Sequence, residues 1–271
     1  MAADEYLLGH SDGELERLQL QAQCLEGLTR RLIRECGIGP GIRVLDLGSG
    51  AGDVAFLVAE AVGPSGFVVG VDREERAVLL ASRRAAQVAL KNVAFKVASD
   101  EALPATPPFD AAIGRFVLVH QPNPAATVSR TAEVLRSGGV IAFLEPALHL
   151  SGHTLPALEL WEAAAGSLSR FSRAALPSHD IAGRIIPCFI DAGLPEPRVL
   201  WEAIVPGSNE IYLRWFISTY KGCLPLMERF GTVDPRVGDP DTLAERIVEE
   251  ALAHRAQGVT SPFASAWAIK N

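Results

Sequence analysis

The sequence predicts a doubly wound α/β fold, in which helices cover both faces of a mostly parallel sheet. Apolar runs alternate with helical patterns through the first half of the chain, as in successive strand–helix units. The apolar runs do not alternate in polarity, which is typical of strands buried on both faces. A glycine-rich turn joins the first apolar run directly to a helical pattern, which is the usual start of such a sheet.

The elements follow in a regular order. Leucines recur at helical spacing between Ser11 and Glu35, and Ser11 with Glu14 can form a capping box, so this segment is expected to be a helix. Seven apolar runs bounded by turn residues are expected to be strands: Ile42–Leu47, Phe67–Val71, Val93–Ala98, Phe109–Gly114, Gly139–Leu144, Arg198–Val205 and Val259–Ile269. Helices are expected at Asp53–Val62, Glu74–Leu90, Pro124–Leu135 and Ile181–Ala192.

The alternation stops after Pro146. His149 to His179 is expected to be mostly helical, and Ser208 to Arg255 helical with breaks at prolines. A connection of this length between the last two strands is too long for an ordinary loop. We therefore expect one domain with an N-terminal helical lid segment (1–36), a ligand-binding core (37–146), and the rest of the sheet (147–271) carrying helical insertions at about 147–180 and 207–256.

Composition excludes several classes of protein. The 271 residues are 48% hydrophobic and 21% charged, which suits a large packed core. The net charge of −7 argues against a broad nucleic-acid surface. The four cysteines are scattered without a Cys-x-x-Cys pair, so neither a disulfide framework nor a structural zinc site is expected. The first residues lack a signal-peptide pattern and no apolar run is long enough to span a bilayer, so we expect a soluble cytoplasmic protein with no membrane partner.

The most informative motif is the loop Asp46-Leu-Gly-Ser-Gly-Ala-Gly52 after the first predicted strand. Glycine tolerates positive φ and leaves backbone N–H groups open to a ligand. The spacing differs from Gly-x-Gly-x-x-Gly and lacks the Gly-Lys-Ser/Thr of a P-loop. Asp72 and Asp100 end the next two predicted strands, where ligands of such sheets bind.

With these residues, the chain resembles a class I S-adenosylmethionine (SAM)-dependent methyltransferase of the ubiquinone/menaquinone-biosynthesis-like small-molecule branch, a family with a Rossmann-like sheet. The resemblance extends over about Tyr6 to Pro146. Besides the glycine loop and the ordered acids, it rests on Val117-Leu-Val-His-Gln-Pro-Asn-Pro124, Arg136-Ser-Gly-Gly-Val140 and the segment Tyr6…Gln21. Asn123 stands where that branch often has Asp, and the chain beyond Pro146 matches no motif of the family.

The resemblance implies SAM as cofactor, with S-adenosylhomocysteine as its product. Gly48, Ser49, Gly50 and Gly52 would pass beneath the methionine part. Around them, the resemblance implies an orienting or ammonium-binding role for Asp46, ribose binding for Asp72 and adenine binding for Asp100. Arg73, beside Asp72, would pack on the adenine or be solvated, and Glu101, beside Asp100, would be a further cofactor contact or an acid of the first helical turn. The resemblance also implies that Arg115 and Phe116 border the sulfonium region and that Tyr6 and Gln21 close over the SAM carboxylate. The alternative for the glycine loop is an ordinary strand–helix turn. For the acids at the strand ends it is a solvated acid or a helix cap, and for Phe116 it is a place in the hydrophobic core.

Methyl transfer needs the acceptor held in line with the methyl group, and a hydroxyl acceptor also benefits from a general base. The candidates are His120, just past the fourth predicted strand, and Glu145 and His149, at the end of the fifth. A packed or solvent-facing role is the alternative for each histidine. His149, His153 and Glu145 together could suggest a metal, but Gly152 and Pro156 disfavour the helix that would align the two imidazoles, so no metal is expected.

We therefore predict a SAM-dependent methyltransferase acting on a small organic acceptor. O-methylation in specialised metabolism is the first hypothesis and C- or N-methylation the next. A SAM-binding fold without methyl transfer, as scaffold or pericyclase, is the alternative from another class. A homodimer is also considered. Aromatic residues of the later segments would line an apolar acceptor pocket or pack the lid against the core: Trp161, Phe171, Trp201, Tyr212, Trp215, Phe216 and Tyr220.

Overall fold

A computed structural model describes residues 12–105, 107–150, 152–205 and 210–271. Its contacts divide the chain into two compact units. The sheet unit comprises Gly27–Ala147, Pro177–Glu202 and Phe263–Asn271. The helical unit comprises Met1–Glu26, Leu148–Leu176 and Ala203–Pro262. Helix α1 (Asp12–Glu35) begins in the helical unit and ends in the sheet unit.

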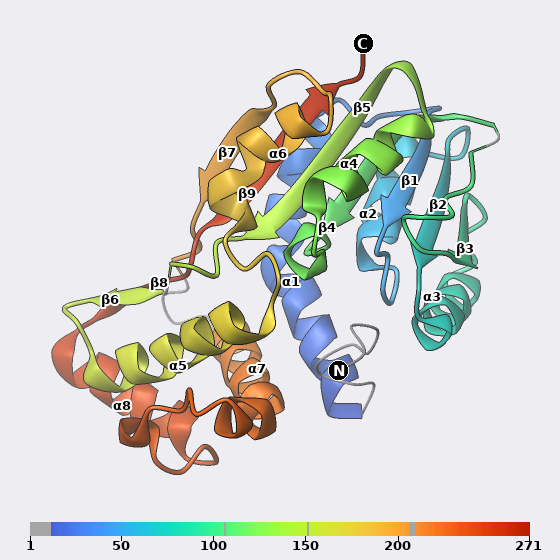
Figure 1. Cartoon of the computed structure of the whole chain (residues 1–271). Coiled ribbons are helices and arrows are strands. Elements are labelled where there is room, and N and C mark those ends of the chain that lie inside the picture. Colours follow the sequence, from blue (N-terminus) through green and yellow to red (C-terminus); the bar gives the residue numbers. More distant parts are fainter. Residues whose placement is uncertain (1–11, 106, 151, 206–209) are drawn as a thin grey trace. The chain divides into compact units, whose positions relative to one another are not determined.

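The sheet unit is built on seven strands in the order β3-β2-β1-β4-β5-β9-β7 (Figure 1). The first five strands of that order are mutually parallel, whereas β9 is antiparallel to both β5 and β7. The predicted doubly wound, mostly parallel, seven-stranded sheet is therefore confirmed. The strands are β1 (Arg43–Leu47), β2 (Phe67–Asp72), β3 (Val93–Val97), β4 (Phe109–Arg115), β5 (Leu135–Pro146), β7 (Arg198–Glu202) and β9 (Phe263–Ile269).

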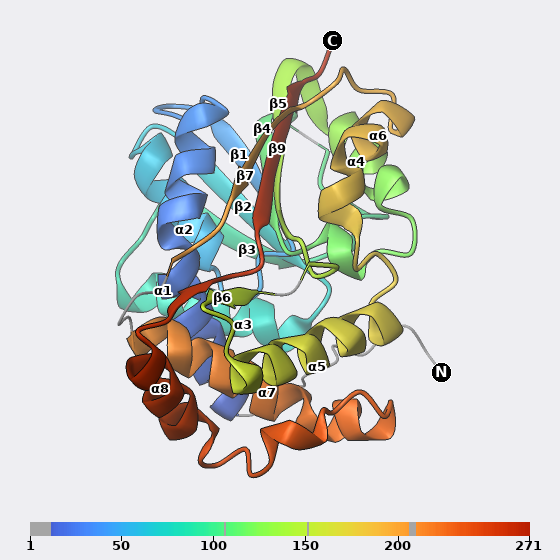
Figure 2. The same cartoon turned by 90° about the vertical axis from the view of Figure 1, so that its left-hand side faces the viewer.

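Helices cover both faces of this sheet. Figure 2 shows α4 and α6 on one face and α2 on the other. The apolar side of α2 buries valines and alanines, as expected for a helix lying on a sheet. Asn123 begins α4: its side chain accepts the Ala126 N–H at 3.1 Å, and Pro124 occupies the first turn. The helices of this unit are α2 (Asp53–Val62), α3 (Glu75–Gln87), η1 (Leu118–His120), α4 (Pro124–Glu133), η2 (Ile181–Arg184) and α6 (Ile185–Asp191).

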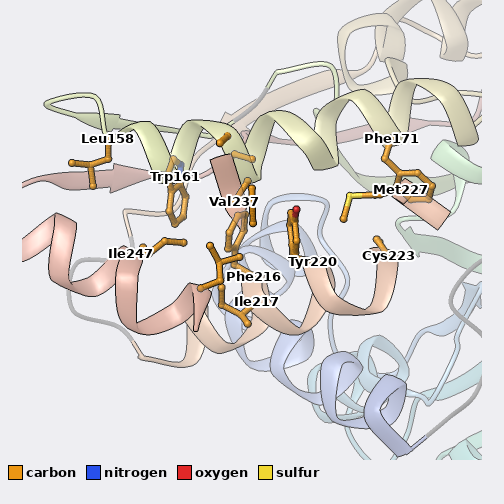
Figure 3. Close-up of a cluster of buried hydrophobic side chains, with 14 of the residues drawn as sticks. Leu158, Trp161, Phe171, Phe216, Ile217, Tyr220, Cys223, Met227, Val237 and Ile247 are labelled. Atoms are coloured by element: carbon orange, nitrogen blue, oxygen red, sulfur yellow. The ribbon is translucent and has the colours of Figure 1, made fainter. Parts of the chain in front are cut away.

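The helical unit is organised around an apolar core shared by three helices. Trp161 stacks on Phe216 with ring centroids 4.7 Å apart, and Tyr220 is fully buried beside them (Figure 3). Most of the aromatic residues predicted for the later segments lie in this core, although Trp201 lies half exposed on β7. The elements of this unit are β6 (His153–Leu155), α5 (Glu159–Ala175), α7 (Glu210–Arg229), η3 (Pro235–Val237), α8 (Leu243–His254) and β8 (Gln257–Val259), besides the start of α1.

The segment from His149 to His179 contains α5, as expected, but it also contains the short strand β6, which pairs antiparallel with β8 and was not predicted. One expectation about these segments was wrong. The expected last strand Val259–Ile269 is divided into β8 and β9, because Pro262 has no N–H to donate to a strand ladder. In the described part of the chain, no helix is both long and apolar enough to cross a membrane.

Candidate functional site

The glycine loop leaves β1 in a conformation that requires glycine. Gly48, Gly50 and Gly52 have φ of 65°, 50° and 91°, in the left-handed region that L side chains rarely adopt. A Cβ atom on Gly48 would also lie 2.7 Å from Cγ2 of Val117. The Ser49 N–H donates to the carbonyl of Val71 at 2.9 Å, which fixes the loop against β2. The loop therefore presents bare backbone at the carboxyl end of β1.

Asp72, at the end of β2, is tied to this loop. Its Oδ2 accepts the Gly50 N–H at 2.8 Å and its Oδ1 accepts the Glu74 N–H at 3.0 Å. A carboxylate oxygen has a second lone pair, so both oxygens keep capacity for a ligand hydroxyl. The neighbouring Arg73 is largely exposed and lies 3.8 Å from the Glu74 carboxylate. Asp72 thus lies beside the loop, as the sequence predicted for the ribose-binding acid.

The carboxylate of Asp100, after β3, accepts hydrogen bonds from the described residues through one of its two oxygens. Its Oδ2 accepts the Thr127 hydroxyl at 2.6 Å and the Arg130 Nε–H at 3.2 Å, and it also pairs with Nη2 of Arg130. Within the described residues, Oδ1 of Asp100 accepts no hydrogen bond. Helix α4 therefore orients this carboxylate and leaves one oxygen available, while Glu101 is exposed. The anchors Thr127 and Arg130 were not predicted.

Asp46 lies near the end of β1 and the part-buried Arg115 at the end of the neighbouring strand β4. Asp46 is 1% exposed, and neither of its carboxylate oxygens has a hydrogen-bond partner among the described residues. Burial raises the Asp46 pKa to about 8, against the opposing field of Arg115. Burial in turn lowers the pKa of Arg115, against the fields of Asp53 and Asp46.

Phe116 follows Arg115 at the end of β4 and also has left-handed φ, at 60°. Its ring stacks on Phe263 of β9, with centroids 5.9 Å apart and planes within 9° of parallel. A positive φ in a bulky residue is costly and persists only where the surroundings hold it. Phe263, which the sequence analysis did not single out, is thus part of this end of the sheet.

Glu145, at the end of β5, is fully buried and holds the segment after β4. Its Oε1 accepts the N–H groups of Val117 and Leu118 at 3.0 and 2.8 Å, and its Oε2 accepts that of Val119 at 3.1 Å. Burial raises the pKa of Glu145 to about 8, although the three N–H donors oppose this shift. These bonds shape η1, which ends at the exposed His120.

The remaining described residues that the sequence singled out belong to the helical unit. His149 belongs to the helical unit, as does the exposed His153 on β6. Gln21 is half-buried on α1, where its Oε1 accepts from Nη1 of Arg17 at 3.0 Å. Tyr6 lies outside the described residues. Among the residues that are described, no three His, Cys, Asp or Glu side chains gather in a way that could hold a metal ion.

The chain matches a family of methyltransferase domains over residues 38–191. The chain belongs to this methyltransferase-domain family. The match includes the glycine loop, Asp72, Asp100, Arg115 and Glu145, and it confirms both the predicted family and SAM as the cofactor. Gln21, Phe263 and much of the helical unit lie outside the match.

Relatives with named activities are similar over somewhat less than half of the chain. Aklanonic acid methyltransferase DauC of Streptomyces sp. is 34% identical over 119 residues, which cover 43% of this chain and 54% of that protein. Nocamycin O-methyltransferase of Saccharothrix syringae is 36% identical over 121 residues, which cover 44% of this chain and 43% of that protein. The chain thus spans about half the length of these relatives.

A solved structure extends the similarity of fold. The YcgJ protein of Bacillus subtilis superposes with a TM-score of 0.57 at 18% identity, covering 90% of this chain and 99% of that one. At this identity the likeness concerns the fold alone.

Proposed function

We propose that this chain transfers the methyl group of SAM to a hydroxyl oxygen of a small organic acceptor in specialised metabolism. The observation that carries the proposal is the left-handed glycine loop beside Asp72, with Asp100 after the next strand. O-methylation is favoured over C- or N-methylation because one relative is named as an O-methyltransferase, of nocamycin.

The sheet unit would bind the adenosyl part through its acids. Asp72 accepts hydrogen bonds from the ribose hydroxyls while keeping its bonds to the N–H groups of Gly50 and Glu74. Asp100 accepts from the adenine amino group through Oδ1, because Oδ2 is already occupied by α4. The backbone of the glycine loop would lie against the methionine part, because Gly48, Gly50 and Gly52 carry no Cβ atom and have left-handed φ.

SAM supplies an electrophilic methyl group on its sulfonium. The acceptor oxygen forms a bond to the methyl carbon as the carbon–sulfur bond breaks, and the electron pair stays on sulfur to give S-adenosylhomocysteine. In this proposal His120 takes the hydroxyl proton on an imidazole nitrogen. Glu145 acts as a positioning residue, because its oxygens already hold the N–H groups of the three residues before His120.

The helical unit would select the acceptor. Its core is aromatic, and the indole N–H groups of Trp161 and Trp215 have no hydrogen-bond partner within the described part of the chain. An apolar ring compound carrying oxygen acceptors would satisfy both requirements, stacking and hydrogen bonding.

The first test is calorimetric titration of the purified chain with S-adenosylhomocysteine. Saturable binding is expected, and its absence would exclude the proposed function. Incubation with SAM and a panel of hydroxylated aromatic acceptors then tests transfer, with mass spectrometry of the product and NMR of the new methyl group. A methyl on carbon or nitrogen would favour those chemistries, and binding without any turnover would favour a SAM-binding protein that transfers no methyl.

A further inference from the structure

Strand β7 forms one edge of the seven-stranded sheet, and among the described strands only β9 pairs with it. In an antiparallel pair, alternate residues direct their N–H and C=O groups toward the partner strand, so the other residues of β7 direct theirs outward. Such an edge can pair with another strand unless charge, proline or a covering segment prevents it. The outer edge of β7 is therefore a candidate interaction surface.

The sequence of β7 is self-complementary in an antiparallel pairing. If a twofold axis relates two copies at Leu200, Arg198 of each copy lies opposite Glu202 of the other. Val199 then lies opposite Trp201. Opposite charges directly across an antiparallel pair are favourable, and so is an aromatic residue across from a β-branched one. An axis at either end of the strand would instead place two arginines or two glutamates opposite each other, so the charges select one register.

The charged residues of β7 are both available for this contact. Arg198 is exposed and makes no ion pair with any residue that the structure describes. Oε1 of Glu202 accepts from Nη1 of Arg31 on α1 at 2.9 Å, and a carboxylate has a second oxygen for another arginine. Helix α1 lies on the same face of the sheet as α2, because Arg30 pairs with Glu60 of α2 at 2.8 Å. The two ion pairs between copies would therefore form on the α1 face.

The opposite face of β7 is apolar. Side chains alternate between the faces of a strand, so Val199 and Trp201 lie on the face that carries α4 and α6 (Figure 2). Trp201 is half exposed there. On the same face of the sheet, α6 exposes Ile186 and Ile190, which are four residues apart and share one side of the helix. A second copy would bury apolar surface on this face while its charges pair on the other.

The other edge of the sheet has a different pattern. Strand β3 carries a single charged residue, the exposed Lys96, one position from its C-terminal end. No acidic residue on β3 could face this lysine in a second copy. A lone lysine on an edge strand is a common guard against pairing. Balanced charge therefore distinguishes β7 from β3 as the edge suited to self-association.

We propose that two copies of this chain associate through β7, antiparallel about Leu200, so that their sheets join into one continuous sheet. The pairing supplies about four to six main-chain hydrogen bonds, according to which alternate residues face outward, besides two ion pairs between Arg198 and Glu202. The contact is the same on both copies, so it closes at a dimer. Three strands separate β7 from β1 and its glycine loop, so the dimer should form with or without the methyl donor.

Sedimentation equilibrium of the purified chain tests the association. A concentration-dependent rise toward twice the chain mass of 28.9 kDa is expected between about 1 µM and about 1 mM. Arg198→Glu should raise the dimer dissociation constant about tenfold or more, because two attractive pairs become repulsive. Arg83→Glu is the matched control, since it makes the same charge change at an exposed arginine of α3, which packs against β3 at the other edge.

Mixing two charge variants tests the register. Arg198→Glu alone places glutamates opposite each other, and Glu202→Arg alone places arginines opposite each other, so each should associate weakly with itself. In an equimolar mixture every glutamate lies opposite an arginine. The mixed dimer is therefore expected to form with a dissociation constant within about threefold of that of the unmodified chain. Native mass spectrometry distinguishes it by mass, and hydrogen exchange of the β7 amides should slow on mixing.

A chain that stays monomeric over the whole concentration range would overturn the inference. So would a dimer that Arg198→Glu leaves unchanged, or a mixture of the two folded variants that does not associate. Thermal melting checks the fold of each variant. If Glu202→Arg unfolds because it repels Arg31, Glu202→Gln replaces it: this variant keeps an acceptor for Arg31 and should raise the dissociation constant several-fold. An unchanged constant in Glu202→Gln would also refute the proposed pairing.

Discussion

Replacing Asp46 by Asn is expected to stabilise the ligand-free protein. The Asp46 carboxyl is fully buried, and its pKa rises from 3.8 to about 8 on folding. A group whose pKa is raised by folding contributes its stability below the unfolded value and loses it as pH rises toward the folded value. The wild-type protein therefore loses stability from this group between about pH 4 and pH 8, and Asn removes that dependence.

The size of the expected change in unfolding free energy follows from the shift in the Asp46 pKa. Each pKa unit corresponds to about 1.4 kcal/mol, so the three units between pH 5 and pH 8 amount to about 4 kcal/mol. The free energy of unfolding of Asp46→Asn minus that of the wild type should grow by this amount over that range. Glu145, whose pKa is also raised, titrates in both proteins, and its contribution cancels in the difference.

Urea unfolding of both proteins at pH 5, 6, 7 and 8, without ligand, measures this difference directly. Asp191→Asn is the matched control, because it makes the same substitution at an exposed aspartate at the end of α6. A difference between Asp46→Asn and the wild type that stays constant across the range would refute the reasoning, since the carboxyl would then titrate alike in both states. The same variant should bind S-adenosylhomocysteine more weakly, so stability and binding move in opposite directions.

Four further variants test the rest of the site. Asp72→Ala should weaken S-adenosylhomocysteine about 100-fold in calorimetry, because it removes the ribose acceptor and the anchor of the Gly50 N–H; an unchanged affinity would exclude that role. His120→Ala should lower kcat about 10²-fold or more at saturating acceptor while leaving donor binding unchanged, and an unaltered kcat would remove His120 from catalysis. Trp161→Phe keeps an aromatic ring but removes the indole N–H, so KM for the acceptor should rise several-fold with little change in kcat, whereas an equal effect on donor affinity would contradict an acceptor role. Glu145→Gln replaces one acceptor of backbone N–H groups by a donor and should lower the melting temperature by several degrees, and unchanged melting would show that the three bonds contribute little.

Sequence reasoning succeeded where the signal was local. The glycine loop, the alternation of strands and helices along the chain and the acids at strand ends lie within single strand–turn–helix units, and glycine spacing and apolar runs encode them. The contacts that orient Asp100 and Arg115 were not predictable in the same way. Arg130 reaches Asp100 from 30 residues away, and Thr29 reaches Arg115 from 86 residues away. Neither pair leaves a periodic or compositional trace, because only the assembled sheet brings its members together.

The missed strands have a different cause. β6 and β8 have three residues each, too few for a periodic pattern to distinguish them from the helical segments around them. Gly152 is a sequence signal of this strand pairing, since a Cβ atom there would lie 2.9 Å from the carbonyl oxygen of Val259. An isolated glycine marks a close backbone approach of this kind, but it does not identify the approaching strand.

The two buried carboxyls show why burial and pKa alone do not assign a role. Asp46 and Glu145 are both almost fully buried, and the pKa of each is raised to about 8. Glu145 nevertheless holds three backbone N–H groups, so its oxygens are already used within the protein. Asp46 has no comparable set of backbone donors among the described residues, and Arg115, whose field lowers the Asp46 pKa, is held by Thr29 instead. The two carboxyls therefore share burial and a raised pKa but differ in hydrogen bonding, so neither burial nor pKa by itself assigns a role to either of them.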